Sequence, residues 1–176
     1  MPRILATEIV EHGPALYRIA WRILRHAEEV DDVLQDVAVQ AVKISQSETE
    51  IENWCALLKR ITVCRSLDRL RVRERRSTEG FQESDLSQTT ASVVDNVIGR
   101  ELETRLSHAI SVLPDRQAEV FSLRYFDACS NKEIASSLNI STAAVATALK
   151  KARERLRNLL SDCSASLNSN KGECHE

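Results

Sequence analysis

Glycine, proline and aromatic residues are all scarce in this chain of 176 residues, which has four glycines, three prolines and 4% aromatic residues. The glycines, Gly13, Gly80, Gly99 and Gly172, are too far apart to form a G-x-G-x-x-G turn or a P-loop. Enzymes that bind nucleotides through such loops are therefore excluded. An all-β sandwich or barrel needs frequent turns, and so few turn-forming residues argue against that class.

Long apolar runs and paired cysteines are also missing. No stretch of about 18 apolar residues exists, so no transmembrane helix is expected. The first residues, MPRILATEIVEHGP, hold one arginine and no apolar segment of the kind that forms a secretory signal. The five cysteines are irregularly spaced and form no C-x-x-C pair. The simplest interpretation is a reduced, cytoplasmic protein.

The charges are separated into blocks. The formal net charge is −2, which on its own argues against a nucleic-acid partner. Residues 27–52 nevertheless carry a net −7, residues 59–76 a net +6, residues 77–104 a net −5 and residues 145–160 a net +4. Such blocks usually mark solvated helix faces, and they become partner surfaces when they recur at defined places in a fold.

The first 76 residues show the period of an α-helix. Gly13-Pro14 is expected to start the first helix or to break a longer one, and a second helix is predicted over residues 27–43. Their apolar stripes are Leu16, Ile19, Ala20, Ile23 and Leu24, and Val30, Val33, Leu34, Val37, Ala38 and Ala41. Asp32, Gln35, Asp36 and Val39 project from the side opposite the second stripe.

A third helix is predicted over residues 51–76, followed by a linker. Trp54, Leu57, Leu58, Ile61 and Cys64 share its apolar face. Asp68 lies on the continuation of that face and is interpreted as a structural ion-pair or hydrogen-bond partner. Residues 77–93 have no sustained period and are rich in Ser, Thr, Gln and Glu, which is typical of a linker between two helical units.

The second unit has the spacing of a helix-turn-helix. An apolar stripe of Ile98, Leu102, Leu106, Ala109 and Leu113 stops at Pro114, and a helix is predicted over residues 115–126. Ser130 and Glu133 form a capping-box pattern before a short helix. A turn at residues 139–141 follows, with Ser141 as the cap of the last helix, and Ala135 suits the close approach of the two helices. An ordinary helical hairpin remains the alternative at this point.

In a helix-turn-helix, the second helix lies in the major groove of DNA. Its exposed residues would face the bases and phosphates, with Arg153 and Arg157 nearer the phosphates. The candidate DNA-binding residues are Ser141, Thr142, Ala143, Ala146, Thr147, Lys150, Lys151 and Arg153.

The segment LPDRQAEVFSLRYFDACSNKEIASSLNISTAAVATALKKARERLRNLL resembles the C-terminal DNA-binding domain of extracytoplasmic-function (ECF) sigma factors of bacterial RNA polymerase. The family pattern L-P-x-x-x-R/Q-x-V-F-x-L-R-Y, then S-x-x-E-I-A-x-x-L-x-I-S, runs from Leu113 to Ser141. In the N-terminal half, Asp32, Gln35 and Asp36 match the family's D-x-x-Q-D/E pattern. The W…D-x-x-R…R-R pattern of the helix that contacts the −10 promoter element is matched by Trp54, Asp68, Arg69, Arg71, Arg75 and Arg76.

The resemblance implies an all-α protein of two small helical domains, joined by a flexible polar linker, with the second ending in a helix-turn-helix. The expected parts are residues 1–76, the linker 77–94, residues 95–162 and a disordered tail 163–176. The expected partners are core RNA polymerase, bound by Asp32, Gln35, Asp36 and Val39, promoter DNA, and an anti-sigma factor. The −10 element would be bound by Trp54, Arg65, Arg69, Arg71, Arg73, Arg75 and Arg76. The loop at residues 45–53 would capture a flipped −10 base.

Several residues depart from the family pattern. Cys64 stands where the family usually has asparagine, and Ala144, Ala146 and Ala148 replace the usual Thr, Lys and Arg of the recognition helix. Lys151 also stands where the family usually has arginine. Each lost base contact would remove about 1–3 kcal/mol of discrimination. Either −35 recognition is weaker, or the sequence that is read is more apolar.

Neither catalysis nor a cofactor is expected, because three of the four histidines, at positions 12, 26 and 108, are isolated from any nucleophile or metal-ligand pattern. Cys163, Cys174 and His175 of the tail lack a close pair and make a weak metal site at most. The free protein is expected to be a monomer without membrane insertion. Two alternatives stay open: a stand-alone helix-turn-helix regulator, and a degenerate sigma-like protein that acts by sequestering another protein.

Overall fold

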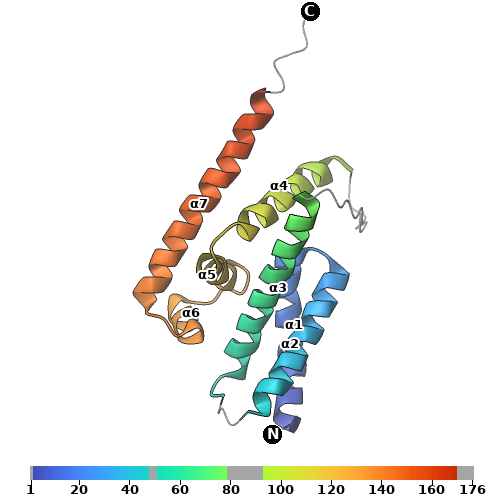
Figure 1. The fold of residues 1–176 in the computed structure, drawn as a ribbon, viewed down its shortest axis with the longest axis vertical. Coiled ribbons are helices and arrows are strands. Elements are labelled where there is room, and N and C mark those ends of the chain that lie inside the picture. The colour runs from blue at the N-terminus through green and yellow to red at the C-terminus, as the bar shows by residue number, and fades with distance from the viewer. Residues whose placement is uncertain (1, 48–50, 79–92, 170–176) are drawn as a thin grey trace, which may run out of the picture.

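The computed structural model describes residues 2–47, 51–78 and 93–169 of the chain, with side chains described for 7–47, 51–77 and 102–161. These residues form seven α-helices and no strand (Figure 1). The helices are α1 (Pro2–Leu24), α2 (Ala27–Ser45), α3 (Trp54–Thr78), α4 (Val93–Ser111), α5 (Asp115–Tyr125), α6 (Asn131–Leu138) and α7 (Thr142–Ser169). The predicted all-α class with two helical units is confirmed.

Helices α1, α2 and α3 form the N-terminal unit. α1 runs without interruption through Gly13 and Pro14, so the predicted start or break at this pair is wrong. A proline inside a helix costs about 3 kcal/mol because it removes one backbone hydrogen bond. Contacts on both sides of Pro14 offset that cost, since Leu16 is buried and Ile9 is partly buried against the same core.

Arg25 and His26 form the junction between α1 and α2. Arg25 adopts a left-handed conformation with a φ of 54° between α1 and α2, and its amide donates to Trp21 O at 2.9 Å. His26 then caps α2, because its Nδ1 accepts from the amide of Glu29 at 3.5 Å. Such caps satisfy amides that have no partner inside the helix.

The C-terminal unit contains the predicted helix-turn-helix. Ser130 and Glu133 form the predicted capping box, with bonds of 2.7 and 3.3 Å. α6 ends at Leu138, and the C-cap residue Asn139 adopts a left-handed conformation with a φ of 51°. Ser141 then caps α7 by accepting from the amide of Ala144 at 3.1 Å. Ala135 is buried, and α6 contacts α7.

Three expectations differ from the structure. Leu102 belongs to the predicted apolar stripe, but its side chain is 58% exposed, whereas Leu106 is partly buried and Ala109 and Ile110 are buried farther along α4. Asp68 is exposed and not buried along the stripe of α3. α7 continues to Ser169, seven residues into the tail that was expected to be disordered, and no proline or glycine interrupts the sequence before Gly172.

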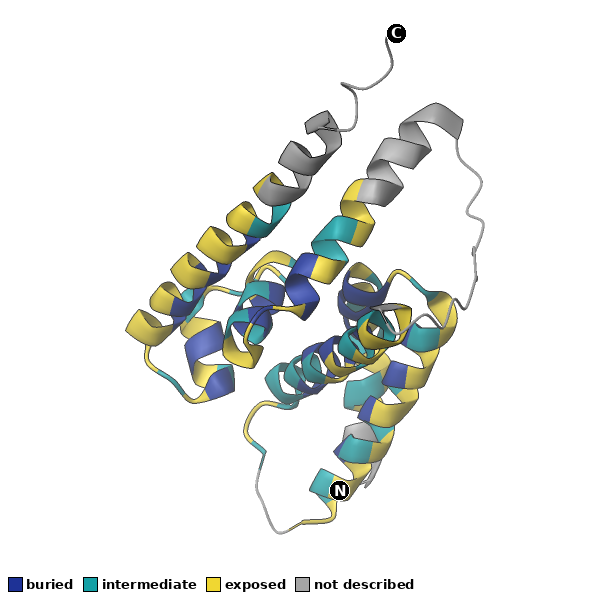
Figure 2. Ribbon diagram, turned by 45° about the horizontal axis from the view of Figure 1, so that its top comes forward, coloured by how far each residue is buried: buried dark blue, intermediate teal, exposed yellow. Residues whose placement is uncertain are grey.

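α3 is the central helix of the molecule. It contacts α1 and α2 within its own unit and α4, α5 and α6 of the other unit (Figure 1). Leu58, Leu67 and Leu70 are fully buried along it. α7 lies at the edge of the molecule away from α1 and α2. Its buried side faces α5 and α6, and its outer side is exposed (Figure 2). The basic blocks at residues 59–76 and 145–160 therefore lie on helices with very different surroundings, α3 and α7.

Candidate functional site

One face of α2 carries the four residues predicted to project from it. Asp32, Gln35, Asp36 and Val39 are all exposed, and Val39 is 54% exposed although it is apolar. The opposite face is buried in the N-terminal core through Val30, Val33, Val37 and Ala41. The predicted division of the helix into a core face and a solvent face is confirmed.

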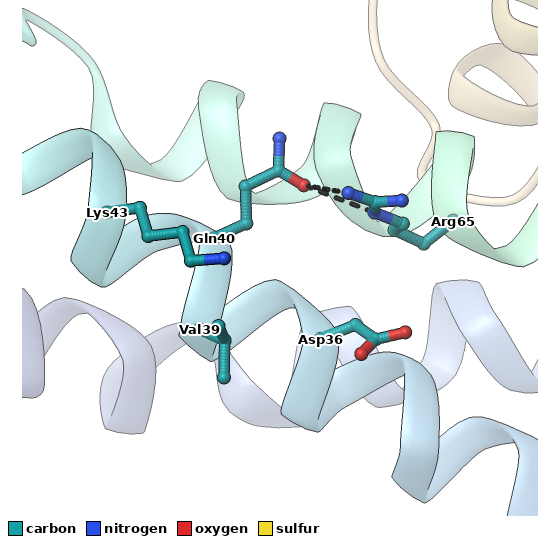
Figure 3. Close-up of a pocket in the computed structure, with 5 residues that line it drawn as sticks. All are labelled: Asp36, Val39, Gln40, Lys43 and Arg65. Carbon is teal, nitrogen blue, oxygen red and sulfur yellow. Dashed lines mark hydrogen bonds between the residues drawn. The ribbon is translucent and has the colours of Figure 1, made fainter.

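Two arginines of α3 contact this face of α2. Arg69 Nη1 lies 2.8 Å from Asp32 Oδ2, and Arg69 Nη2 lies 3.9 Å from Asp36 Oδ2. Arg65 donates to Gln40 Oε1 through Nε at 3.2 Å and Nη2 at 2.9 Å (Figure 3). Asp36, Val39, Gln40, Lys43 and Arg65 line a shallow hollow between the helices.

The other arginines of the predicted −10 set differ in their surroundings. Arg73 Nη1 donates to Leu24 O at 2.9 Å and contacts Glu29 Oε2 at 2.8 Å, so it joins the end of α1 to the start of α2. Arg75 and Arg76, in the last turns of α3, are exposed. Arg65 is also exposed, but its guanidinium is hydrogen-bonded to Gln40.

Arg71 crosses to the C-terminal unit. Its guanidinium donates to Ser111 O at 3.2 Å and Leu113 O at 3.1 Å, and Nη1 lies 2.8 Å from Asp115 Oδ1. These groups belong to the end of α4 and the start of α5. A planar guanidinium can satisfy several acceptors at once, so Arg71 holds the turn between the two helices against α3.

Two of the further polar contacts between the units involve Lys59 and Cys64 of α3. Lys59 Nζ lies 2.9 Å from Asp127 Oδ2, and the Cys64 thiol donates to Glu119 Oε1 at 3.2 Å. Burial, together with the charge and hydrogen bond of Glu119, raises the pKa of the Cys64 thiol to about 12. Burial alone would lower the pKa of Lys59, but Asp127 more than compensates and raises it. We call the contacts that Lys59, Cys64 and Arg71 of α3 make with the C-terminal unit the seam.

Cys129 lies beside the seam. Its thiol donates to Asp127 Oδ2 at 3.0 Å, and burial followed by that hydrogen bond raises its pKa to about 12. A thiol is reactive mainly as the thiolate, so Cys64 and Cys129 are held in their less reactive form.

The outer face of α7 presents the residues predicted to bind DNA. The whole set from Ser141 to Arg153 is exposed: Ser141, Thr142, Ala143, Ala146, Thr147, Lys150, Lys151 and Arg153. Thr147 donates its hydroxyl to Ala143 O at 2.9 Å. Ala144 and Ala146 are also exposed, whereas Ala148 is buried and therefore is not placed to contact a base.

The remaining candidates are placed as follows. Trp54 is partly buried against the core at the start of α3. Residues 48–50 of the predicted −10 loop (residues 45–53) lie outside the described part of the chain. The same holds for Cys174, His175 and the side chain of Cys163 in the tail. Within the described part, no group of three His, Cys, Asp or Glu side chains could hold a metal ion.

Sequence reasoning missed the acceptors on both sides of α3. Gln40 continues the four-residue spacing of Asp32 and Asp36, which is a signal that the sequence offers. The carboxylates of Glu119 and Asp127 carry no comparable pattern, because they meet α3 only through the packing of the two units.

Comparison with known proteins agrees with this arrangement. Residues 9–76 match the family described as Sigma-70 region 2, and residues 103–156 match Sigma-70, region 4. The chain is 30% identical over 158 residues to the ECF RNA polymerase sigma factor SigW of Bacillus subtilis (strain 168), covering 84% of this chain and 83% of that protein. The chain belongs to the ECF sigma factors.

Solved structures share the fold of this sigma factor. CnrH, solved in complex with the cytosolic domain of CnrY, is 24% identical with a TM-score of 0.59, over 92% of this chain and 90% of that one. The sigma factor RpoE, solved with the anti-sigma factor NepR from Bartonella quintana, is 22% identical with a TM-score of 0.55, over 89% and 96%.

As an RNA polymerase sigma factor, the protein binds core polymerase and directs transcription initiation at specific promoters. This decides against a stand-alone helix-turn-helix regulator, which would not need the N-terminal match. Among the described residues, no helix is long and apolar enough to cross a membrane.

Proposed function

We propose that the two functions of this sigma factor are divided between the exposed face of α2 and the exposed face of α7. Asp32, Gln35, Asp36 and Val39 would bind core polymerase. Exposed side chains of α7 would read the −35 element. The observation that carries this assignment is that both sets are solvent-facing, on helices whose opposite faces are buried in separate units.

For the −10 region, we propose that Arg75 and Arg76 supply phosphate contacts. Both are exposed, and both stand at the end of α3 nearest the linker. Arg71 would join them only when its bonds to Ser111, Leu113 and Asp115 are released. Trp54 is proposed to support the −10 loop from the core, because its ring is packed rather than free to stack on a base.

On the α7 face, Lys150, Lys151 and Arg153 would neutralise phosphates. Ala143 and Ala146 would lie against bases, where a methyl group can touch the methyl group of thymine. A −35 element rich in thymine on the contacted strand is therefore expected. Of the three alanines that depart from the family pattern, Ala148 is buried. Only Ala144 and Ala146 would therefore alter contacts with DNA.

The protein is proposed to act as a non-catalytic, cytoplasmic subunit, with chemistry supplied by the polymerase, and to be monomeric when free. An anti-sigma partner is proposed as well. Support for this partner comes from the RpoE structure, which contains the anti-sigma factor NepR and shares the fold. The degenerate sigma-like alternative predicts binding of such a partner without transcription.

Run-off transcription with core polymerase tests the proposal, using templates selected from fragments of the host genome. The wild-type protein is expected to give promoter-dependent transcripts. Changing Asp32, Gln35 and Asp36 together to alanine should abolish them by preventing association with the core. Glu11→Ala, which removes an exposed carboxylate from α1, is the matched control and should leave transcription intact. Tight association of the triple variant with core polymerase would overturn the assignment of α2.

A further inference from the structure

Arg65 and Arg69 form a ladder of contacts between α3 and the solvent-facing side of α2. Arg69 lies 2.8 Å from Asp32 and 3.9 Å from Asp36. Arg65 makes two hydrogen bonds to the amide oxygen of Gln40 (Figure 3). Both arginines belong to the basic block that the sequence assigns to DNA. Their contacts are instead with the helix that carries the candidate polymerase-binding residues.

The ladder follows from matched spacing on the two helices. The acceptors on α2 repeat every four residues, at positions 32, 36 and 40, and the donors on α3 are also four residues apart. Residues at this spacing stack on one face of a helix. The higher-numbered arginine meets the lower-numbered acceptors, so the helices run antiparallel here and the two rows face each other.

The carboxylates are the more exposed members of the ladder. The side chains of Asp32 and Asp36 are 54% and 55% exposed, whereas that of Arg69 is 35% exposed. A partner that approaches this side of α2 from solvent therefore meets carboxylate oxygens first. A DNA phosphate would have to approach Arg69 past two negative charges, which opposes binding.

We propose that Arg65 and Arg69 are positioning residues of the polymerase-binding surface, which hold Asp32, Asp36 and Gln40 in fixed conformations for a cationic partner helix of the core polymerase. This inference rests on the proposed role of the α2 face. Exposed ion pairs contribute little to folding stability, so their value lies elsewhere. Side chains that are already ordered lose less conformational entropy on binding, and the guanidinium also reduces repulsion between the two carboxylates.

The test compares two double variants of the full-length protein. Arg65→Ala/Arg69→Ala removes the ladder, and Arg75→Ala/Arg76→Ala removes the same charge from an exposed part of the same helix. Affinity for core polymerase is measured without DNA, by anisotropy of the labelled sigma factor. Affinity of the assembled holoenzyme for promoter DNA is measured at several salt concentrations. The midpoint of thermal unfolding is compared with that of the wild type for each variant and for Arg65→Lys/Arg69→Lys. This comparison tests whether the fold is kept.

The ladder variant should bind core polymerase roughly five- to tenfold more weakly, with the salt dependence of DNA binding unchanged. The control variant should bind the core normally and lose about two units of salt slope on DNA. Normal core binding by the ladder variant, together with a reduced salt slope, would overturn the inference and return both arginines to the DNA-binding set.

A double-mutant cycle separates positioning from direct contact. In a background that carries only Gln40→Ala, which keeps Asp32 and Asp36, removal of Arg65 should have no further effect on core binding. Additive losses would mean that Arg65 touches the polymerase itself, and its positioning role would be wrong. If the variant with Asp32, Gln35 and Asp36 all changed to alanine still binds core polymerase normally, the proposed function of α2 is wrong. That result differs from a failure of the positioning role, in which the α2 variant loses core binding but the arginine variant does not.

Discussion

α3 and α7 are both strongly basic helices, but their charges have different surroundings. α3 carries eight lysines and arginines, and Arg65, Arg69, Arg71 and Arg73 are bound to acceptors elsewhere in the chain. α7 carries five, and Lys150 and Lys151 are exposed with no ion pair in the described residues. Positive charge in a sequence therefore predicts a need for negative partners, and only packing decides whether those partners lie inside or outside the molecule.

The largest expected effect is the protection of the Cys64 thiol from alkylation. This thiol reports whether α3 stays packed against the C-terminal unit, which α7 does not require for its exposed face. Its pKa of about 12, against 9.0 for an ordinary cysteine, predicts that alkylation at pH 9 is on the order of a thousandfold slower than in the unfolded chain. Peptide mapping after timed alkylation of the native and urea-unfolded protein measures the ratio. Equal rates in the two states would mean that the seam is open most of the time in solution.

The raised pKa also determines how stability depends on pH. The folded state binds the thiol proton more tightly than the unfolded state, so the contribution of Cys64 is fully present below about pH 9. It is lost as the pH rises from 9 toward 12.

A smaller but still large effect is expected on α7. Replacement of Lys150, Lys151 and Arg153 by alanine should weaken holoenzyme binding to promoter DNA on the order of a hundredfold at 0.1 M salt. The salt slope should fall by about 2.7. Filter binding or anisotropy at several salt concentrations measures both values. Arg18→Ala, which removes an exposed charge from α1, should change neither. An unchanged slope for the triple variant would show that these charges do not reach phosphates.

The contrast can be sharpened at Arg71, the α3 arginine that holds the C-terminal unit. Arg71→Ala leaves two backbone carbonyls without their charged donor and should raise the alkylation rate of Cys64 roughly tenfold, because the seam opens more often. Arg75→Ala is the matched control on the same helix. If both variants alkylate at the wild-type rate, Arg71 does not hold the units together.

The smallest effect expected is in the capping box before α6. Ser130→Ala should lower the free energy of unfolding by about 1 kcal/mol, whereas Ser136→Ala, at an exposed position of the same helix, should not lower it. Hydrogen bonds from Ser130 lower the pKa of Glu133, so its contribution is present above the ordinary value of 4.5 and lost as the pH falls below it. Urea unfolding at neutral and acid pH measures both effects.

The sequence predicts the local structure of this protein well because the relevant signals are local. The capping box at Ser130 and the cap at Ser141 each join residues three positions apart, and neighbouring members of the apolar stripe of α2 are at most three positions apart. The exposed faces of α2 and α7 follow from the same periodicity. Even so, local rules were wrong at Pro14, where tertiary contacts on both sides outweigh the helix-breaking effect.

Contacts between the two units could not be predicted in the same way. Arg71 and Asp115, or Lys59 and Asp127, are far apart in the sequence and are brought together by the packing of α3 against α4, α5 and α6. Arginines that bind phosphates and arginines that bind carboxylates have the same local sequence signature. Their roles depend on which acceptor lies within a few ångströms, which is a property of the folded chain.

Several arginines in this structure donate to main-chain carbonyls across long sequence distances. Arg22 donates to Phe126 O at 2.8 Å, and Arg71 donates to the carbonyls of residues 111 and 113. Because a carbonyl is present whatever the side chain, the acceptor positions are free to change during evolution without loss of the bond. These contacts would leave little covariation between the paired positions. An insertion or deletion in the turn before α5 or after it would break them, since the path of the backbone is what these arginines recognise.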